Sequence, residues 1–294
     1  MYGWLIVNGY FKSDKFEELF SFLLQAAEKR GIILEKIENC AVVADVMTGK
    51  IITPETQKPD FVLFWDKDIR LAMTLEACGF RLFNRAEAIR LCDDKSLTYL
   101  ALAGAGVKQP RSFIAPFAFS RSPRNNSDFF FECAKELGYP MVIKECRGSF
   151  GTGVHLVNND EETAALVQQL GSAPCIVQEY IKESFGRDIR VSVVGGKVAA
   201  AMLRQGREGD FRSNLTLGGH FARIEPSEAQ LSAAIAATEA LGLDFAGVDV
   251  LFGKDDEPII CEVNSNAHFK TTFDCTGVNM AEHIIDHILS EVGK

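Results

Sequence analysis

The sequence lacks an apolar run of about 18 residues, the length a membrane helix needs, and it has no basic leader before its first apolar stretch. We therefore expect no membrane span and no signal peptide. It also lacks a C-x-x-C pair, and its eight cysteines are scattered, mostly through apolar segments. This pattern is typical of reduced thiols and predicts a cytoplasmic protein.

Positive charge is also in deficit, since 31 Lys and Arg face 40 Asp and Glu, for a net charge of −9. This balance argues against bulk binding to nucleic acid or anionic membranes, although a local basic groove is still allowed. A Gly-x-Gly-x-x-Gly fingerprint is missing from the first strand–helix unit. No Ser/His/Asp or Cys/His arrangement indicates nucleophilic catalysis.

Hydrophobic residues make up 47% of the chain, which is enough for a full core. The first third alternates short strands with a helix predicted from Asp14 to Arg30 and capped by Ser13, which indicates a small open α/β sheet. From residue 93 the pattern becomes α+β. A helix is predicted over 160–170 and a strand over 175–179. Two further strands, 188–194 and 197–203, flank a Gly-Gly turn, and an alanine-rich helix is predicted over 227–241.

A polar β-hairpin near the C-terminal end is the most informative feature. Residues 247–252 and 259–264 are two strand patterns joined by a polar loop. If the loop is symmetric, Asp249 faces Glu262, and Asn264 lies two residues further along the same face. Facing carboxylates repel each other, so we expect a cation between them, and these oxygen ligands suit Mg²⁺ or Mn²⁺. The alternative is an ordinary hairpin with a polar outer face.

A lysine and a glycine-rich loop form a second candidate site. Lys144 ends an apolar strand, and Gly148, Gly151 and Gly153 follow in a loop that leads into another strand. Glycines allow close backbone approach, and their N–H groups can form a nest for an anion. The loop lacks the Gly-Lys-Ser/Thr ending of a Walker A motif, and a plain hairpin loop is the alternative.

Several weaker signals point to the same chemistry. Lys95 lies at the start of a predicted helix, where it is either a phosphate ligand or a surface lysine. Arg212 lies in a polar stretch that suits a lid over phosphates, or a solvated loop. Residues 178–181 end a strand, where exposed backbone groups can read an adenine edge. Asp188 and Arg190 share one strand face, which suggests a lined cleft.

Taken together, these motifs resemble RimK-type ATP-grasp ligases, whose namesake adds glutamate to a ribosomal protein. The similarity covers residues from about 90 to the end and rests on these runs: Asp94-Lys95, 142–144, 148–153, 177–182, 188–190, 208–214, 246–249 and 262–264. The resemblance implies α/β and α+β architecture. A pre-ATP-grasp α/β domain would span 1–92, and two α+β ATP-grasp subdomains, 93–182 and 183–294, would clasp ATP.

The resemblance also implies roles for individual residues. Residues that would bind ATP are Lys95, Lys144, Gly148, Ser149, Gly151, Gly153, Gln178, Glu179, Tyr180, Ile181, Asp188, Arg212, Ser213 and Asn214. Arg212 and Lys144 would also stabilise charge during catalysis. Asp249, Glu262 and Asn264 would hold Mg²⁺ or Mn²⁺, usually as two ions.

The implied activity is an ATP-dependent ligase that activates a carboxylate as an acyl phosphate and joins it to an amine. The partners would be that carboxylate and an amino acid, peptide or protein tail, and such ligases are often homo-oligomers. A nucleotide-binding regulatory protein and an ATP-dependent kinase are the alternatives.

One segment departs from the family. After Glu262-Val-Asn264 the namesake continues Ala-Ser-Pro-Gly, whereas this chain reads Ser-Asn-Ala-His-Phe-Lys-Thr-Thr over 265–272. The segment borders the acceptor side of such ligases, so the resemblance implies another amino acid or amine. Asn266, Lys270 and Thr271 are candidate contacts for a substrate carboxylate, with ordinary turn residues as the alternative.

Overall fold

The computed structural model describes residues 1–293 apart from 56, 120–123, 125, 149–150 and 214–217. The strands are β1 (Tyr2–Val7), β2 (Ile33–Glu38), β3 (Val43–Asp45), β4 (Lys50–Thr53), β5 (Phe61–Phe64), β6 (Leu82–Phe83), β7 (Ser112–Ile114), β8 (Met141–Glu145), β9 (Val154–Val157), β10 (Cys175–Glu179), β11 (Arg187–Val194), β12 (Lys197–Gln205), β13 (His220–Ala222), β14 (Phe245–Phe252) and β15 (Pro258–Asn264). The α-helices are α1 (Asp14–Glu28), α2 (Ile69–Ala77), α3 (Ala86–Asp93), α4 (Lys95–Gly104), α5 (Asp128–Leu137), α6 (Asp160–Leu170), α7 (Glu228–Ala240), α8 (Lys270–Thr276) and α9 (Met280–Val292).

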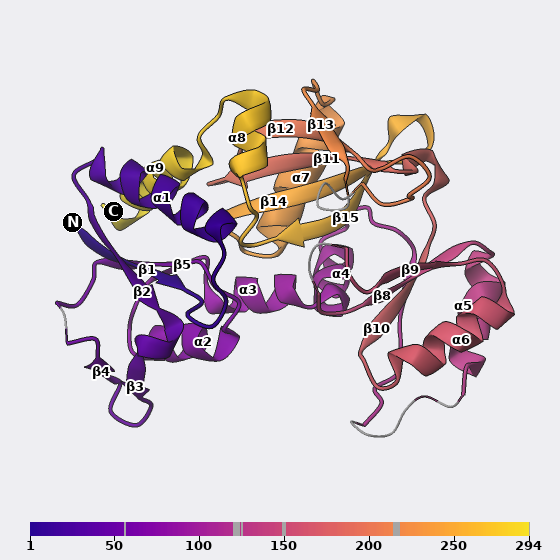
Figure 1. Ribbon diagram of the computed structural model, residues 1–294, viewed down its shortest axis with the longest axis horizontal. Helices are drawn as coiled ribbons and strands as arrows, with labels where there is room; N and C mark the ends of the chain where they lie inside the picture. Colours follow the sequence, from indigo (N-terminus) through magenta and orange to yellow (C-terminus); the bar gives the residue numbers. More distant parts are fainter. Residues whose placement is uncertain (56, 120–123, 125, 149–150, 214–217, 294) are drawn as a thin grey trace.

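The first sheet is parallel and has the order β2-β1-β5-β6. Helices cover both of its faces, as a parallel sheet requires. Leu5 and Leu63 pack with α1 and α9, and Trp4 and Val62 pack with α2 and α3 on the other face. The expected small open α/β unit is therefore present, with the separate β3–β4 hairpin beside it (Figure 1).

The second sheet is antiparallel, with the order β7-β10-β8-β9. Helices α5 and α6 pack on one face of this sheet through a core that includes Phe130, Val167 and Met141. The predicted strand 175–179 and helix 160–170 match β10 and α6. The opposite face of the sheet carries Val142 and Lys144, both of which line a cleft.

The third sheet is a five-stranded antiparallel one with the order β13-β12-β11-β14-β15. Its apolar face packs against α7, which begins with a capping box formed by Ser227 and Gln230. Ala234 and Ala237 of α7 contact the strands, and α4 packs beside α7 through Leu102. The opposite face is polar near the cleft.

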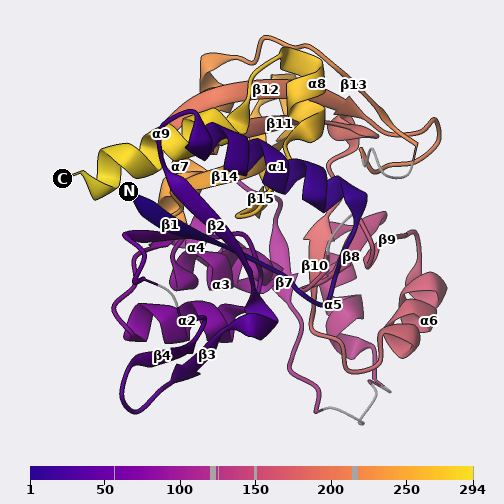
Figure 2. The ribbon, with the colours of Figure 1, turned by 60° about the vertical axis from the view of Figure 1, so that its left-hand side comes forward.

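Two features join the first sheet to the third. Helix α9, near the C-terminal end, lies side by side with α1 over the first sheet (Figure 2). Fully buried Asn84 donates to the carbonyl oxygens of Phe245 at 2.9 Å and Ser265 at 3.0 Å. These contacts fix where residues 265–269 lie.

Within the described part of the chain, no helix is long and apolar enough to cross a membrane.

Candidate active site

A cleft of about 540 Å³ lies between the first sheet, the second sheet and the polar face of the third. This volume is in the range of ligand-binding pockets. Its walls come from the segments 8–20 and 65–67, from β8, β9 and the end of β10, and from β11, β12, β14 and β15. The cleft thus gathers residues that are far apart in the sequence.

The polar hairpin has the predicted register, but it reaches that register through a bulge. Asp249 pairs with Glu262, and Gly247 pairs with Asn264. The connecting loop is one residue shorter than predicted, because Phe252 pairs with Pro258. Cys261 is the extra residue that restores the register, so it forms a β-bulge within the site.

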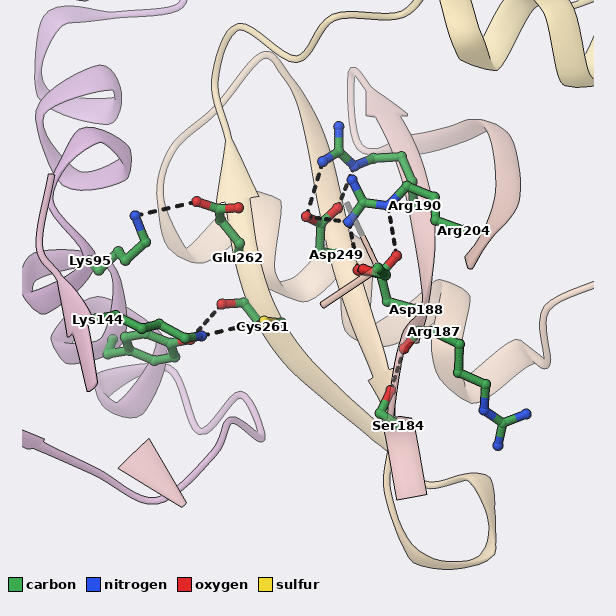
Figure 3. Close-up of polar contacts among 12 residues, drawn as sticks. Lys95, Lys144, Ser184, Arg187, Asp188, Arg190, Arg204, Asp249, Cys261 and Glu262 are labelled. Atoms are coloured by element: carbon green, nitrogen blue, oxygen red, sulfur yellow. Dashed lines mark hydrogen bonds and ion pairs between the residues drawn. The ribbon is translucent and has the colours of Figure 1, made fainter. Parts of the chain in front are cut away.

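Asp249 belongs to a buried cluster of charges that spans three strands (Figure 3). Arg204 of β12 donates to Asp188 of β11 at 2.6 and 2.7 Å and lies 2.7 Å from an oxygen of Asp249 on β14. Arg190 of β11 makes a bidentate contact with Asp249, with Nη2 at 3.0 Å from Oδ2. Asp188 and Asp249 are each 3% exposed, so water cannot solvate their carboxylates. The two guanidiniums stabilise the buried negative charges instead.

The pKa values of the two carboxylates move in opposite directions. Burial raises the pKa of Asp188, although Arg204 opposes the rise. Burial also acts to raise the pKa of Asp249, but Arg190 and Arg204 together outweigh it, and its pKa is lowered. Asp249 is therefore held as an anion, which is the form that binds a metal ion.

Glu262 and Asn264 complete a donor set that fits a hard divalent cation. Glu262 lies 3.5 Å from the Lys95 ammonium, and its side chain is 35% exposed. The amide nitrogen of Asn264 is buried without a partner among the described residues. Two carboxylates and one amide oxygen suit Mg²⁺ or Mn²⁺. Among the described residues, no group of three or more His, Cys, Asp or Glu side chains could hold a metal ion.

The two predicted phosphate lysines both line the cleft. Lys95 is the first residue of α4, where its Nζ lies 3.3 Å from the carbonyl oxygen of Gly148. The cap of that helix is Asp94, which accepts from the backbone of Ser96 at 3.0 Å. Lys144 is only 8% exposed, and its Nζ lies 3.6 Å from the sulfur of Cys261. Each ammonium therefore lies at the junction of the second and third sheets.

The glycine-rich loop has the backbone that its sequence predicts. Gly148, Gly151 and Gly153 all have positive φ values, at 147°, 74° and 70°. At Gly153 a Cβ would also lie 2.8 Å from the carboxylate of Glu145, so a side chain cannot fit without movement. Ser149 lies outside the described residues.

The predicted adenine-reading segment lies at the end of β10, and its side chains have separate tasks. Gln178 is 1% exposed and donates to the hydroxyl of Ser112 at 2.7 Å. Glu179 accepts from the backbone of Arg111 at 2.8 Å. Both side chains are thus engaged within the protein, and all four residues of the segment, 178–181, line the cleft.

The predicted lid residues connect the third sheet to the glycine-rich loop. Arg212 pairs with Asp210 at 2.9 Å, and its Nη1 lies 3.3 Å from the carbonyl oxygen of Gly151. Ser213 donates its hydroxyl to Asp188. Asn214 lies outside the described residues.

The three candidate substrate contacts do not lie together. Asn266 and Thr271 line the cleft. Lys270 is not among the residues described as lining it, and its ammonium is 2.7 Å from the carboxylate of Asp274. Asn266 donates one hydrogen of its Nδ2 to the carbonyl oxygen of Asp66 at 2.9 Å, and its Oδ1, an acceptor, has no partner among the described residues. The unpartnered Oδ1 suits an N–H group of a ligand, and the second hydrogen of Nδ2 is still a donor.

Sequence reasoning did not identify Arg204, Asn8 or Asp66. The predicted strand ends at Leu203, two residues before the end of β12, and unbroken alternation from the Gly-Gly turn would pair Asp188 with Leu203. A register shift between Ser192 and Val193 places Arg204 opposite Asp188 instead. Asn8 and Asp66 follow β1 and β5 at the carboxyl edge of a parallel sheet. That edge is where ligands bind in open α/β sheets, so the rule could have found both residues.

Residues 92–288 match the RimK-like ATP-grasp domain family. The chain is 36% identical to β-citrylglutamate synthase B of Danio rerio over 226 residues, covering 76% of this chain and 54% of that protein. It is 34% identical to a probable α-L-glutamate ligase of Shewanella amazonensis over 291 residues, covering 94% and 93%. A RimK domain ATP-grasp protein of Sphaerobacter thermophilus has a similar structure, with a TM-score of 0.74, 20% identity, and coverage of 98% and 99%.

The chain spans between 54% and 62% of the length of the first curated relatives it matches. The structural likeness, at 20% identity, supports the fold, and this fold is the predicted combination of a small α/β unit with an ATP-grasp unit.

Proposed function

This chain belongs to the RimK-like ATP-grasp family, and on that basis we propose that it is an ATP-dependent ligase that joins a carboxylate to an amine. One observation carries the proposal. A single cleft brings together two lysines for phosphates, a glycine-rich loop, and an acidic hairpin with Asp249 opposite Glu262. Its relatives include proteins named as synthases and ligases of glutamate-containing products.

ATP would bind between the second and third sheets. Lys95 and Lys144 would neutralise its phosphates under residues 148–153, and the backbone after β10 would read the adenine. Asp249, Glu262 and Asn264 would hold Mg²⁺ or Mn²⁺, which would neutralise charge on the triphosphate. The neighbouring arginines keep Asp249 ionised for this task.

The reaction would proceed in two steps. A substrate carboxylate oxygen attacks the γ-phosphorus, the bond from that phosphorus to the bridging oxygen breaks, and ADP leaves. The nitrogen of the amine then attacks the acyl carbon, phosphate departs with the carbon–oxygen electron pair, and the nitrogen loses a proton to give an amide. Lys144 and Arg212 would stabilise the charge that develops on the transferred group. Contact between Arg212 and Gly151 would close the cleft and exclude water from the acyl phosphate.

A substrate screen tests the proposal. The protein is incubated with ATP, Mg²⁺ and pairs from a panel of carboxylates and amines, and both ADP and product mass are measured. We expect ADP release that depends on a carboxylate, and a product whose mass is that of the amide. Tight ATP binding without ADP release from any pair would favour the regulatory alternative. A phosphorylated product without an amide would favour the kinase.

Gly206 provides a test of Arg212 that leaves the arginine itself unchanged. A Cβ at Gly206 would lie 1.9 Å from the backbone oxygen of Arg212, so Gly206→Ala must displace that backbone. We expect kcat/KM for ATP to fall about tenfold to a hundredfold, because Arg212 would move away from the glycine-rich loop.

Gly104→Ala is the matched control, since a Cβ there meets nothing within 4 Å and its backbone is helical. We expect normal ATP kinetics in this variant. Unchanged ATP kinetics in Gly206→Ala as well would show that catalysis does not depend on the position of Arg212.

A further inference from the structure

The end of the cleft that borders the first sheet is not used by the proposed nucleotide site. In the first sheet, with the order β2-β1-β5-β6, β2 lies on one side of β1 and β5 lies on the other. The strand order therefore reverses direction at β1. Asn8 and Asp66, the residues that follow β1 and β5, lie at this switch point and line the cleft. Open α/β sheets bind ligands at such points.

Asp66 is a buried carboxylate whose described partners carry no charge. Its side chain accepts from Asn8 at 3.1 and 3.3 Å and from the backbone of Lys67 at 2.7 Å. The residue is 7% exposed, and this burial raises its pKa. The Lys67 ammonium is 2.7 Å from Asp93 instead. A cationic ligand would therefore supply what this carboxylate lacks.

Two further residues that line this cleft, Asn266 and His268, carry hydrogen-bond acceptors that have no partner among the described residues. Asn266 keeps its Oδ1 without a partner among the described residues, because its Nδ2 donates to the backbone of Asp66. His268 has its Nε2 3.0 Å from the carbonyl oxygen of Lys15, so Nε2 must be the protonated nitrogen. Burial lowers the pKa of His268 and keeps the ring neutral, so its Nδ1 is an unpartnered acceptor. An acceptor-rich site of this kind suits a group with several N–H donors.

Aromatic rings wall the same end of the cleft. Phe11, Phe16, Phe20 and Trp65 all line it. The ring centroid of Phe16 lies 5.7 Å from that of Phe11 and 6.1 Å from that of His268, and both pairs meet edge to face. Phe16 therefore contacts both Phe11 and the segment that carries His268. Phe11 is nevertheless 61% exposed, which leaves a large apolar surface at the mouth.

We propose that this end of the cleft is the subsite for the amine substrate, and that the amine carries an aromatic or similarly apolar group. Asp66 anchors its ammonium group with help from Asn266 and His268, and the rings enclose its apolar part. That the bound amine is a substrate rests on the proposed ligase function, whereas its binding at this site does not depend on turnover.

Glutamate, which the names of the relatives suggest, fits this end less well. A glutamate needs cations for two carboxylates. The lysines that line this end are Lys15 and Lys67, and each already interacts with other groups of the protein. The four aromatic side chains are matched instead to a ligand with one positive charge and an apolar body.

Calorimetry with phenethylamine and L-glutamate tests the anchor. The full chain is titrated in the presence of ADP and Mg²⁺, and Asp66→Asn is compared with Asp68→Asn. Asp68 is a matched control because it loses a charge two residues away and does not line the cleft. Its role as the cap of α2, accepting from Leu71 at 3.0 Å, is one that asparagine also fills. We expect phenethylamine to bind more tightly than glutamate, and its affinity to fall at least about tenfold in Asp66→Asn only.

A second pair of variants tests the aromatic wall. Phe11→Ala should weaken phenethylamine binding several-fold, whereas Phe117→Ala should not. Phe117 is the matched control, since it is 77% exposed, contacts another ring in Phe119, and lies outside the cleft lining. Both substitutions are at exposed positions, so the fold is retained.

The outcomes separate this inference from the ligase proposal. Preferential binding of glutamate, or equal phenethylamine binding by Asp66→Asn and the wild type, overturns the subsite even if amides are formed. Binding as expected, with no amide from any carboxylate–amine pair, overturns the ligase and leaves the subsite as a site for apolar amines. In the active enzyme, Asp66→Asn should raise KM for the amine and leave KM for ATP unchanged, which a purely structural role would not do.

Discussion

A Glu262→Gln variant is expected to lose about a hundredfold to a thousandfold in kcat while it keeps its fold. The change removes one negative charge from the proposed metal ligands and preserves the shape of the side chain. Glu262 is partly exposed and pairs with Lys95 at 3.5 Å, so the lost charge has little effect on stability. ADP release gives kcat and the Mg²⁺ concentration for half-maximal rate, which should increase. Chelation with EDTA should stop the wild-type reaction.

Glu257→Gln is the matched control for this variant. Glu257 lies in the loop of the same hairpin and pairs with Lys108, as Glu262 pairs with Lys95. Its kcat should equal that of the wild type. Asp249→Asn should reproduce the loss of activity seen in Glu262→Gln. Full activity in Glu262→Gln, or an unchanged Mg²⁺ dependence, would reject the metal assignment.

An Arg204→Met variant is expected to lose about 3–5 kcal/mol of folding free energy. Arg204 bridges the buried carboxylates of Asp188 and Asp249, at 2.6 and 2.7 Å. Methionine fills much of the same space but leaves one guanidinium, that of Arg190, for two buried anions. Urea unfolding measures the loss. Arg207→Met is the control, because Arg207 is exposed in the loop after β12, and its stability should change by no more than about 0.5 kcal/mol.

The stability deficit of Arg204→Met should shrink as the pH falls. Arg204 lowers the pKa of Asp249 and opposes the increase that burial causes at Asp188. Without it, both folded-state pKa values rise relative to the wild type, while the unfolded chain titrates as before. The folded variant therefore binds more protons than the folded wild type, and protonation favours its folded state. The difference in unfolding free energy should be smaller at about pH 5 than at about pH 7.5. A constant difference would contradict the bridging role of Arg204.

The sequence predicted local structure well wherever the signal was local. The predicted limits of β10 and α6 agree with the structure, and the two strands around Gly195 differ by one or two residues at their ends. The pairing of Asp249 with Glu262 is also confirmed, although the bulge at Cys261 was not predicted. A bulge depends on how one residue packs between two sheets, and the hairpin pattern alone does not encode that packing.

What the sequence missed depends on tertiary contacts. β2 carries the charged Glu35 and Lys36 at an edge of the first sheet, so its strand pattern is weak, and β6 has only two residues. Predicted helix α1 has Ser13 at its N-cap, but the hydroxyl makes no capping hydrogen bond. Arg204 and Asp66 each meet their partners only because strands and segments distant in the chain come together.

The position of α9 has a consequence for biosynthesis. A ribosome completes β1 and β5 well before it reaches Met280–Val292, yet Ile284, Ile285 and Ile288 belong to the core that covers one face of those strands. During translation that face lacks the cover of α9, so the nascent chain exposes apolar surface until this helix emerges. Chaperone binding to the unfinished chain, and its release after α9 is added, would be the signature of this late closure.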